Sequence, residues 1–191
     1  MSHNFHKTIR RMLDIDLVPG RFVWDQACGG SSQWISLFRE GTKSRGARYA
    51  CVDAVVVVDP SVRLILEIEE SGANGFLPNR ILGKVTTSGL CRFFIAAGEA
   101  HAVPFGEPVT FLQIVNTAGL KSRSRKVEQY RNLERDIRDR LLPIGSIGAY
   151  FLIPGDADAF QTGTAGDDLR RIIRSAVGTS RPLSGPGCRT Q

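Results

Sequence analysis

The chain has few cysteines and few histidines, and neither residue type is arranged as a metal site. The four cysteines lie at positions 28, 51, 91 and 188, without the C-x2-C spacing typical of zinc sites. We therefore expect reduced thiols in a cytoplasmic protein. Two of the three histidines lie close to the N-terminus, which leaves His101 as the one central histidine. Its glycine-containing loop is typical of a surface residue rather than of a general base.

Long hydrophobic segments are missing as well. No purely apolar run is longer than five residues, the length of the segment 54–58, whereas about 20 are needed to cross a bilayer. The N-terminal segment alternates charged and apolar residues, so it lacks the continuous apolar stretch of a secretion signal. These absences predict a protein that is neither inserted into a membrane nor secreted.

Three common site motifs are also absent. The chain contains no G-x-x-x-x-G-K-[ST], no G-x-G-x-x-G and no G-x-S-x-G. The P-loop, dinucleotide-binding and serine-hydrolase classes therefore lose their usual support.

The composition is that of a folded protein with a modest basic excess. The chain has 191 residues, of which 42% are hydrophobic, and a formal net charge of +6. This length predicts one domain, which we expect over residues 1–177. Residues 178–191 are rich in Gly, Ser and Pro and are expected to form a disordered tail. The charge permits a polyanionic partner without identifying one.

The hydrophobic pattern predicts alternating strands and helices, as in an α/β fold. Apolar residues spaced by three and four indicate helices at 6–17, 79–90, 121–142 and 167–177. Strands are expected at 34–38, 49–59, 63–69, 92–97, 108–115 and 147–153. Asp59, Pro60 and Ser61 have turn chemistry, so segments 49–59 and 63–69 are expected to form a β-hairpin.

Carboxylates interrupt both strands of this hairpin. Asp53 lies within a run of Val, Ala and Cys, and Glu67 and Glu69 alternate with apolar residues. Three carboxylates on one face repel one another unless a cation lies between them, and hard oxygen ligands of this kind suit Mg²⁺. The alternative is that Asp53 is a hydrogen-bonded core acid and that the two glutamates form the solvent side of an amphipathic edge strand.

The loop length of the hairpin decides whether the three acids share a face. A two-residue loop with regular pairing would put Asp53 on the side opposite the two glutamates. A three-residue loop closed by Asp59 and Arg63 would instead place Asp53 opposite Glu69 and on the face of Glu67. We therefore predict an odd loop or a β-bulge.

At these residues the chain resembles the PD-(D/E)XK nuclease superfamily. The core of that family runs helix, three strands, helix, strand, and its signature is an acid on the second strand followed by (D/E)-x-K on the third. Asp53 and Glu67-Ile68-Glu69 match this layout, with Glu69 in place of the usual lysine. The expected elements between residues 6 and 97 match it as well. The resemblance implies a restriction endonuclease-like α/β fold, with an αβββαβ core and a central mixed sheet flanked by helices.

The resemblance also implies the roles of the residues. Asp53, Glu67 and the backbone carbonyl of Ile68 would bind Mg²⁺, with Mn²⁺ as a substitute. Either Glu69 or Lys84, a lysine supplied by the following helix, would orient or deprotonate the attacking water. The implied activity is hydrolysis of phosphodiester bonds, with DNA as the expected partner. A nucleic-acid-binding module without activity and a metal-dependent hydrolase of another substrate are the alternatives, and homodimerisation stays open.

The basic excess is concentrated late in the chain. Residues 121–142 contain eight basic and four acidic residues. The first part of this segment has no acid, so its cations are predicted to contact nucleic-acid phosphates: Lys121, Arg123, Arg125 and Lys126. Later residues form i,i+4 charge pairs typical of a solvated face. Arg80, four residues before Lys84, is a further candidate for phosphate contact, with a solvated helix face as the alternative.

Overall fold

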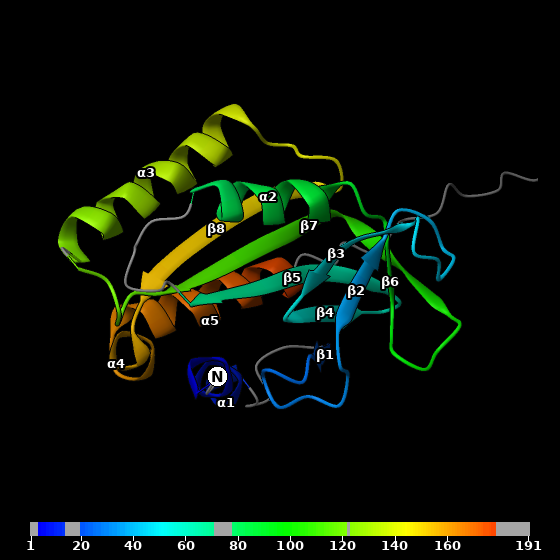
Figure 1. Ribbon diagram of the computed structural model, residues 1–191, viewed down its shortest axis with the longest axis horizontal. Coiled ribbons are helices and arrows are strands. Elements are labelled where there is room, and N and C mark those ends of the chain that lie inside the picture. Colours follow the sequence, from blue (N-terminus) through cyan, green and yellow to red (C-terminus); the bar gives the residue numbers. More distant parts are fainter. Residues whose placement is uncertain (1–3, 14–19, 71–77, 122, 179–191) are drawn as a thin grey trace, which may run out of the picture.

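The protein is an α/β structure with a central mixed sheet of eight strands flanked by helices (Figure 1). The computed structural model describes residues 4–13, 20–70, 78–121 and 123–178. The helices are α1 Asn4–Leu13, α2 Pro78–Gly89, α3 Arg123–Arg140, α4 Ala157–Gln161 and α5 Thr164–Gly178. The strands are β1 Arg21–Trp24, β2 Ile35–Phe38, β3 Arg48–Val52, β4 Ala54–Val58, β5 Ser61–Glu70, β6 Phe93–Ile95, β7 Ala102–Asn116 and β8 Ile147–Gly155.

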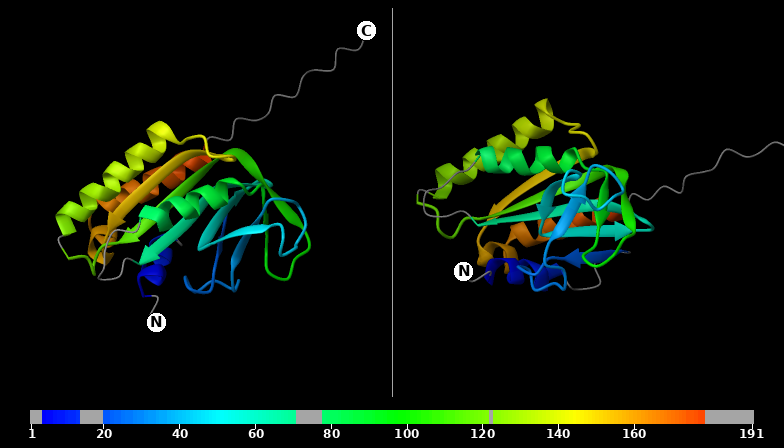
Figure 2. Two further views of the ribbon diagram at one scale, coloured as in Figure 1. Left: turned by 45° about the horizontal axis from the view of Figure 1, so that its top comes forward. Right: turned by 45° about the vertical axis from the view of Figure 1, so that its right-hand side comes forward.

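The sheet has two parts that share β7 (Figure 2). In the first part, β1, β4 and β5 are antiparallel neighbours, and β5, β7 and β8 run parallel. Parallel neighbours need a crossover connection, and α2 lies in the connection between β5 and β7. In the second part, β6 pairs with the beginning of β7, and β2 and β3 follow it. Long β7 therefore holds the two parts together.

Side chains of successive residues point to opposite faces of the sheet, and in the first part of the sheet both faces are buried. Ile65 and Phe111 face a core that includes residues of α2 and α3. Leu64, Leu66 and Leu112 face a second core, which includes residues of α1 and α5. Because both faces of β5 are covered, the apolar side chains of this strand enter one core or the other.

The predicted strand 49–59 is in fact two strands. The chain changes partners at Asp53: β3 before it pairs with β2, and β4 after it pairs with β1 and β5. A continuous run of β-branched residues indicates that a strand is buried, but it does not indicate which strands it pairs with. The break at Asp53 therefore could not be predicted from the hydrophobic pattern. Segments 34–38 and 92–97 contain β2 and β6, which belong to the second part of the sheet. The first strand of the antiparallel trio is β1, whose four residues are too few to show alternation.

The hairpin between β4 and β5 contains a bulge, as predicted, but its loop is shorter than expected. Val58 pairs with Ser61, so the loop has two residues rather than being closed by Asp59 and Arg63. The register shifts after Val56, and Arg63 is the extra residue of β5. The register that follows places Asp53 level with Glu67 instead of Glu69.

The remaining expectations concern elements outside this hairpin. Cys28, Cys51 and Cys91 are free thiols, as predicted. Within the described residues, no helix is both long enough and apolar enough to span a membrane. The expected tail begins at Gly178, which is the last residue of α5. Residues 179–191, including Cys188, lie outside the described part of the chain.

Candidate metal centre

Asp53 lies between β3 and β4, where the chain changes its partner strands. Its carboxylate accepts a hydrogen bond from a backbone N–H of β5, as a carbonyl of a paired strand would. Its Oδ2 accepts a hydrogen bond of 2.6 Å from the backbone N–H of Ile68 on β5. Its own N–H donates to the carbonyl of Leu66, and its carbonyl accepts from the N–H of Asp25. Burial raises the pKa of Asp53 to about 6, although nearby His6 and the Ile68 N–H lower it. The carboxylate is thus fixed in position and costly to ionise.

Glu67 lies on the neighbouring strand and meets Lys84 from α2. Its side chain is 5% exposed, and the Lys84 ammonium forms an ion pair with its Oε1. Lys84 also donates a 3.1 Å hydrogen bond to the carbonyl of Cys51 on β3. Burial raises the pKa of Glu67 well above its usual value, and the charge of Asp53 raises it further. The charge of Asp53 thus disfavours ionisation of Glu67, whereas the Lys84 ammonium favours it.

Glu69 forms the second acid–cation pair. Its Oε2 lies 2.7 Å from Nε of Arg80, an ion pair without the alignment of a hydrogen bond. Burial raises the pKa of Glu69, while Arg80 and Lys84 lower it. Arg80, predicted to contact phosphates, therefore already has a carboxylate partner within the protein.

The two glutamates are buried, which contradicts the alternative of a solvated edge strand. Glu67 and Glu69 are each only 4% exposed. They share the face of Ile65, and β5 has a neighbouring strand on each side. The other half of that alternative describes Asp53 correctly, because this side chain is indeed buried and hydrogen-bonded.

Both glutamates have buried oxygen atoms without a hydrogen-bond partner. Among the described residues, these atoms are Oε2 of Glu67 and both carboxylate oxygens of Glu69, and Nε2 of Gln113 also lacks a partner. Gln113 is in register with Glu67 on β7, and its Oε1 accepts a 2.7 Å hydrogen bond from Tyr150. A buried carboxylate oxygen without a partner costs free energy, and a divalent ion would relieve that cost. Asp53 and Glu67 therefore suit a hard cation such as Mg²⁺.

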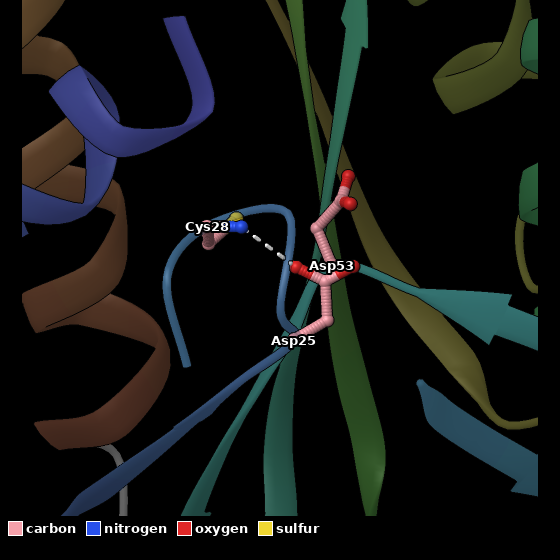
Figure 3. A group of neighbouring side chains, drawn as sticks. All are labelled: Asp25, Cys28 and Asp53. Atoms are coloured by element: carbon pink, nitrogen blue, oxygen red, sulfur yellow. Dashed lines mark hydrogen bonds between the residues drawn. The ribbon is translucent and has the colours of Figure 1, made fainter. Parts of the chain in front are cut away.

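Asp25 and Cys28 lie on the other side of Asp53 and were not predicted (Figure 3). One ligand atom of each of the three residues lies within 4.8 Å of the others. Asp25 directly follows β1, and its Oδ1 accepts a 3.0 Å hydrogen bond from the backbone N–H of Cys28. The turn continues past Cys28 to Gly30, where a Cβ would lie 2.0 Å from the carbonyl oxygen of Trp24, so this position requires glycine. In the sequence, Asp25 lies four residues before the pair Gly29-Gly30, and this spacing could have indicated the loop.

The three-residue group could hold a metal ion, but its donors are mixed. Burial raises the pKa of the Cys28 thiol, and the charges of Asp53 and Asp25 raise it further. A neutral thiol does not suit Mg²⁺, which prefers oxygen, whereas a softer ion binds thiolate. Asp53 is the residue common to this group and to the pair with Glu67.

His6 is a second residue that the sequence did not indicate. The N-terminal position suggested a peripheral role, but His6 is 7% exposed and lies on the buried face of α1. Its Nε2 lies 3.8 Å from Oδ1 of Asp53, and its Nδ1 lies 3.2 Å from Oε1 of Glu70. His101, in contrast, is exposed, as predicted. Helix α1 thus supplies a titratable group to the acidic centre from far away in the sequence.

The predicted phosphate-binding cluster begins at the same edge of the sheet as the acids. The last pair of the parallel strands β5 and β7 is Glu70 with Asn116, and Lys121 follows shortly after β7. Lys121 and Arg125 are exposed and Lys126 is half-buried, while α3 begins at Arg123. Burial raises the pKa of Tyr130 on α3, and the charge of Glu69 raises it further.

Comparison with protein-family models, with curated proteins and with solved structures finds no significant match.

Proposed function

We propose that the protein is a Mg²⁺-dependent nuclease that hydrolyses phosphodiester bonds, with DNA as its expected substrate. The observation that carries the proposal is the contact of Lys84 with Glu67, beside Asp53. Glu67 and Lys84 form an ion pair and the charge of Asp53 acts on both of them, although the usual motif lysine is replaced by Glu69. An acid pair with a lysine is what the PD-(D/E)XK resemblance requires.

The order of elements supports the same proposal. Helix α1, antiparallel strands β1, β4 and β5, helix α2 and parallel strand β7 follow one another along the first part of the sheet. With β2, β3 and β6 left aside, this order agrees with the helix, three strands, helix, strand core that the resemblance implies, although β1, β4 and β7 take the places expected for segments 34–38, 49–59 and 92–97. Glu67 lies on the third of these strands, as in the signature of the family, whereas Asp53 immediately precedes the second strand instead of lying on it.

Asp53 and Glu67 would hold the metal ion, with the carbonyl of Ile68 as a further ligand. When bound, the ion supplies charge that polarises a phosphate and acidifies a water molecule. Of the two residues proposed to orient that water, Lys84 has the better position. Among the described residues, its ammonium has partners in Glu67 and the Cys51 carbonyl, and its third donor would orient the attacking water. Glu69 would then position Arg80 beside the substrate.

Cleavage of supercoiled plasmid DNA in the presence of Mg²⁺ or Mn²⁺ tests the proposal. We expect the wild type to convert the plasmid to nicked or linear forms and Asp53→Ala to leave it intact. Asp139→Ala, which removes an exposed acid near the end of α3, serves as a matched control and should cleave normally. Absence of metal-dependent cleavage by the wild type would contradict the proposal and favour a binding module without activity.

A further inference from the structure

Two of the largest exposed side chains lie on one hairpin. Among the described residues, the exposed large apolar side chains are Trp34 at 56%, Leu90 at 53%, Leu141 at 49% and Tyr49 at 41%. Trp34 directly precedes β2, and Tyr49 is the second residue of β3, which pairs with β2. Each aromatic ring therefore exposes apolar surface that no described part of the chain covers.

Tyr49 lies at a β-bulge of this hairpin. The register shifts between Leu37, which pairs with Ala50, and Phe38, which pairs with Arg48, so Tyr49 is the extra residue of β3. Ile35, Leu37, Ala50 and Val52 belong to the core. Between the positions of the two aromatic residues, Ser36 and Cys51 form a cross-strand pair, with Ser36 Oγ 3.8 Å from Cys51 Sγ. The hairpin thus has an exposed aromatic residue toward each end and a pair of small side chains between them.

The loop that joins β2 to β3 is strongly basic. Residues 39–48 contain four cations and one acid, and all five side chains are exposed: Arg39, Glu40, Lys43, Arg45 and Arg48. Glu40 forms an ion pair with Arg39, so three cations have no acid in their own segment. In Figures 1 and 2 this loop lies at the end of the molecule away from α3. It is therefore separate from the basic cluster at the beginning of α3.

The hairpin leads directly to the candidate metal centre. Ile35 and Val52 are the last pair of β2 and β3, so the next position on each strand brings Trp34 level with Asp53. Asp25 also forms an isolated bridge with Ser32, two residues before Trp34. Trp34 thus lies at the end of the hairpin that leads to Asp53, and the basic loop lies at the other end of the same hairpin.

We infer that this hairpin binds a single nucleic-acid strand and guides it to Asp53, with bases stacked on Trp34 and Tyr49 and phosphates held by Lys43, Arg45 and Arg48. Aromatic side chains combined with a basic groove are the usual means of binding single strands. Bases within a duplex have no free face to stack on an indole. The inference rests on the proposed nuclease function and adds to it a single-stranded or locally opened substrate.

Tryptophan fluorescence in EDTA tests the inference without cleavage. The chain has two tryptophans, and Trp24 is buried at 5% exposure, so quenching by a strand reports on Trp34. We expect short oligothymidylate or oligouridylate to quench the wild type and to bind at least about tenfold more tightly than a duplex of equal length. Trp34→Ala should weaken single-strand binding about tenfold or more, and Trp34→Phe should retain part of it.

Leu141→Ala, at a similarly exposed apolar residue distant from the hairpin, is the matched control and should bind the strand as the wild type does. Lys43→Ala with Arg45→Ala should reduce the salt dependence of binding. The inference is overturned if duplex binds as tightly as single strand without quenching, or if Trp34→Ala binds normally. It is also overturned if Trp34→Ala instead changes the sedimentation of the protein, because the hairpin would then contact a second copy of the chain.

The outcomes separate this inference from the proposed function. If no metal-dependent cleavage occurs but the strand still quenches Trp34, the nuclease proposal fails and the binding inference holds. If cleavage requires Asp53 but is the same in Trp34→Ala, with unchanged single-strand affinity, the nuclease proposal holds and this inference fails.

Discussion

Two neighbouring carboxylates on β5 meet cations from the same helix, yet their surroundings differ. Glu67 pairs with Lys84 and Glu69 pairs with Arg80. Lys84 is 31% exposed and also bonds to β3, whereas Arg80 is 54% exposed. The register of the hairpin places Asp53 level with Glu67. Two ion pairs that look equivalent in sequence therefore have different neighbours, and the proposed metal site includes Glu67 but not Glu69.

The largest difference that we predict between the two ion pairs is the loss of activity when the acid is removed. Glu67→Ala should lower the rate of metal-dependent cleavage by about 10³-fold or more, because loss of a metal ligand removes several kcal/mol of transition-state stabilisation. Glu69→Ala should lower it by about tenfold, as expected for a residue that only positions another. Initial rates of plasmid cleavage at saturating Mg²⁺ measure both. Equal losses of activity in the two variants would contradict the different roles proposed for Glu67 and Glu69.

Removal of Lys84 should lower activity more than removal of Arg80, but this difference should be smaller than that between the two acids. Lys84→Met should lower kcat by about 10²-fold, the lower range for a group that assists proton transfer. Arg80→Met should mainly raise KM, because Arg80 is proposed to lie beside the substrate rather than at the reacting atoms. Steady-state kinetics on an oligonucleotide substrate separate the two parameters. A larger loss of kcat in Arg80→Met than in Lys84→Met would reverse the assignment.

The structure explains how much of the site was visible in the sequence. Asp53, Glu67 and Glu69 were found because acids are rare within apolar strands, and Lys84 was found by its place on the following helix. The loop closure and the exact partner of Asp53 were missed, because a bulge at Arg63 shifts the register without leaving a mark in the hydrophobic pattern. Alternation was still sufficient to predict the shared face of the two glutamates.

Residues brought in by tertiary contacts could not be predicted in this way. His6, Asp25 and Cys28 approach Asp53 from α1 and from the loop after β1, and neither segment shows a motif. The α/β class and most elements followed from periodicity, whereas β1 was too short to recognise. The order of strands in the sheet depends on which edges pair, and hydrophobic patterning alone does not determine that choice.

A smaller effect concerns stability without metal. The pKa of Asp53 is raised from 3.8 to about 6, so the charged form is disfavoured in the fold, and stability is lost as pH rises from about 3.8 to 6. Asp53→Asn keeps an acceptor for the Ile68 N–H but removes the buried charge. In EDTA at pH 7.5 it should therefore raise the free energy of unfolding by about 2 kcal/mol. Glu69→Gln should gain less stability, because the Glu69 carboxylate already has Arg80 as a partner.

Urea denaturation with and without Mg²⁺ measures this effect. The ion should stabilise the wild type but not Asp53→Asn, because binding to the folded state alone raises its stability. Asp139→Asn, at an exposed position, is the control and should behave as the wild type in both conditions. A lower stability of Asp53→Asn in EDTA would show that this carboxylate is structural rather than held ready for a cation.

Anomalous diffraction from crystals soaked in Mn²⁺ tests the metal centre most directly. The predicted result is one strong peak within about 2.1 Å of carboxylate oxygens of both Asp53 and Glu67, absent from crystals of Glu67→Ala. A peak bound by Asp25 and Cys28 without contact to Glu67, or no peak near Asp53, would contradict the assignment of Asp53 and Glu67 as the metal ligands.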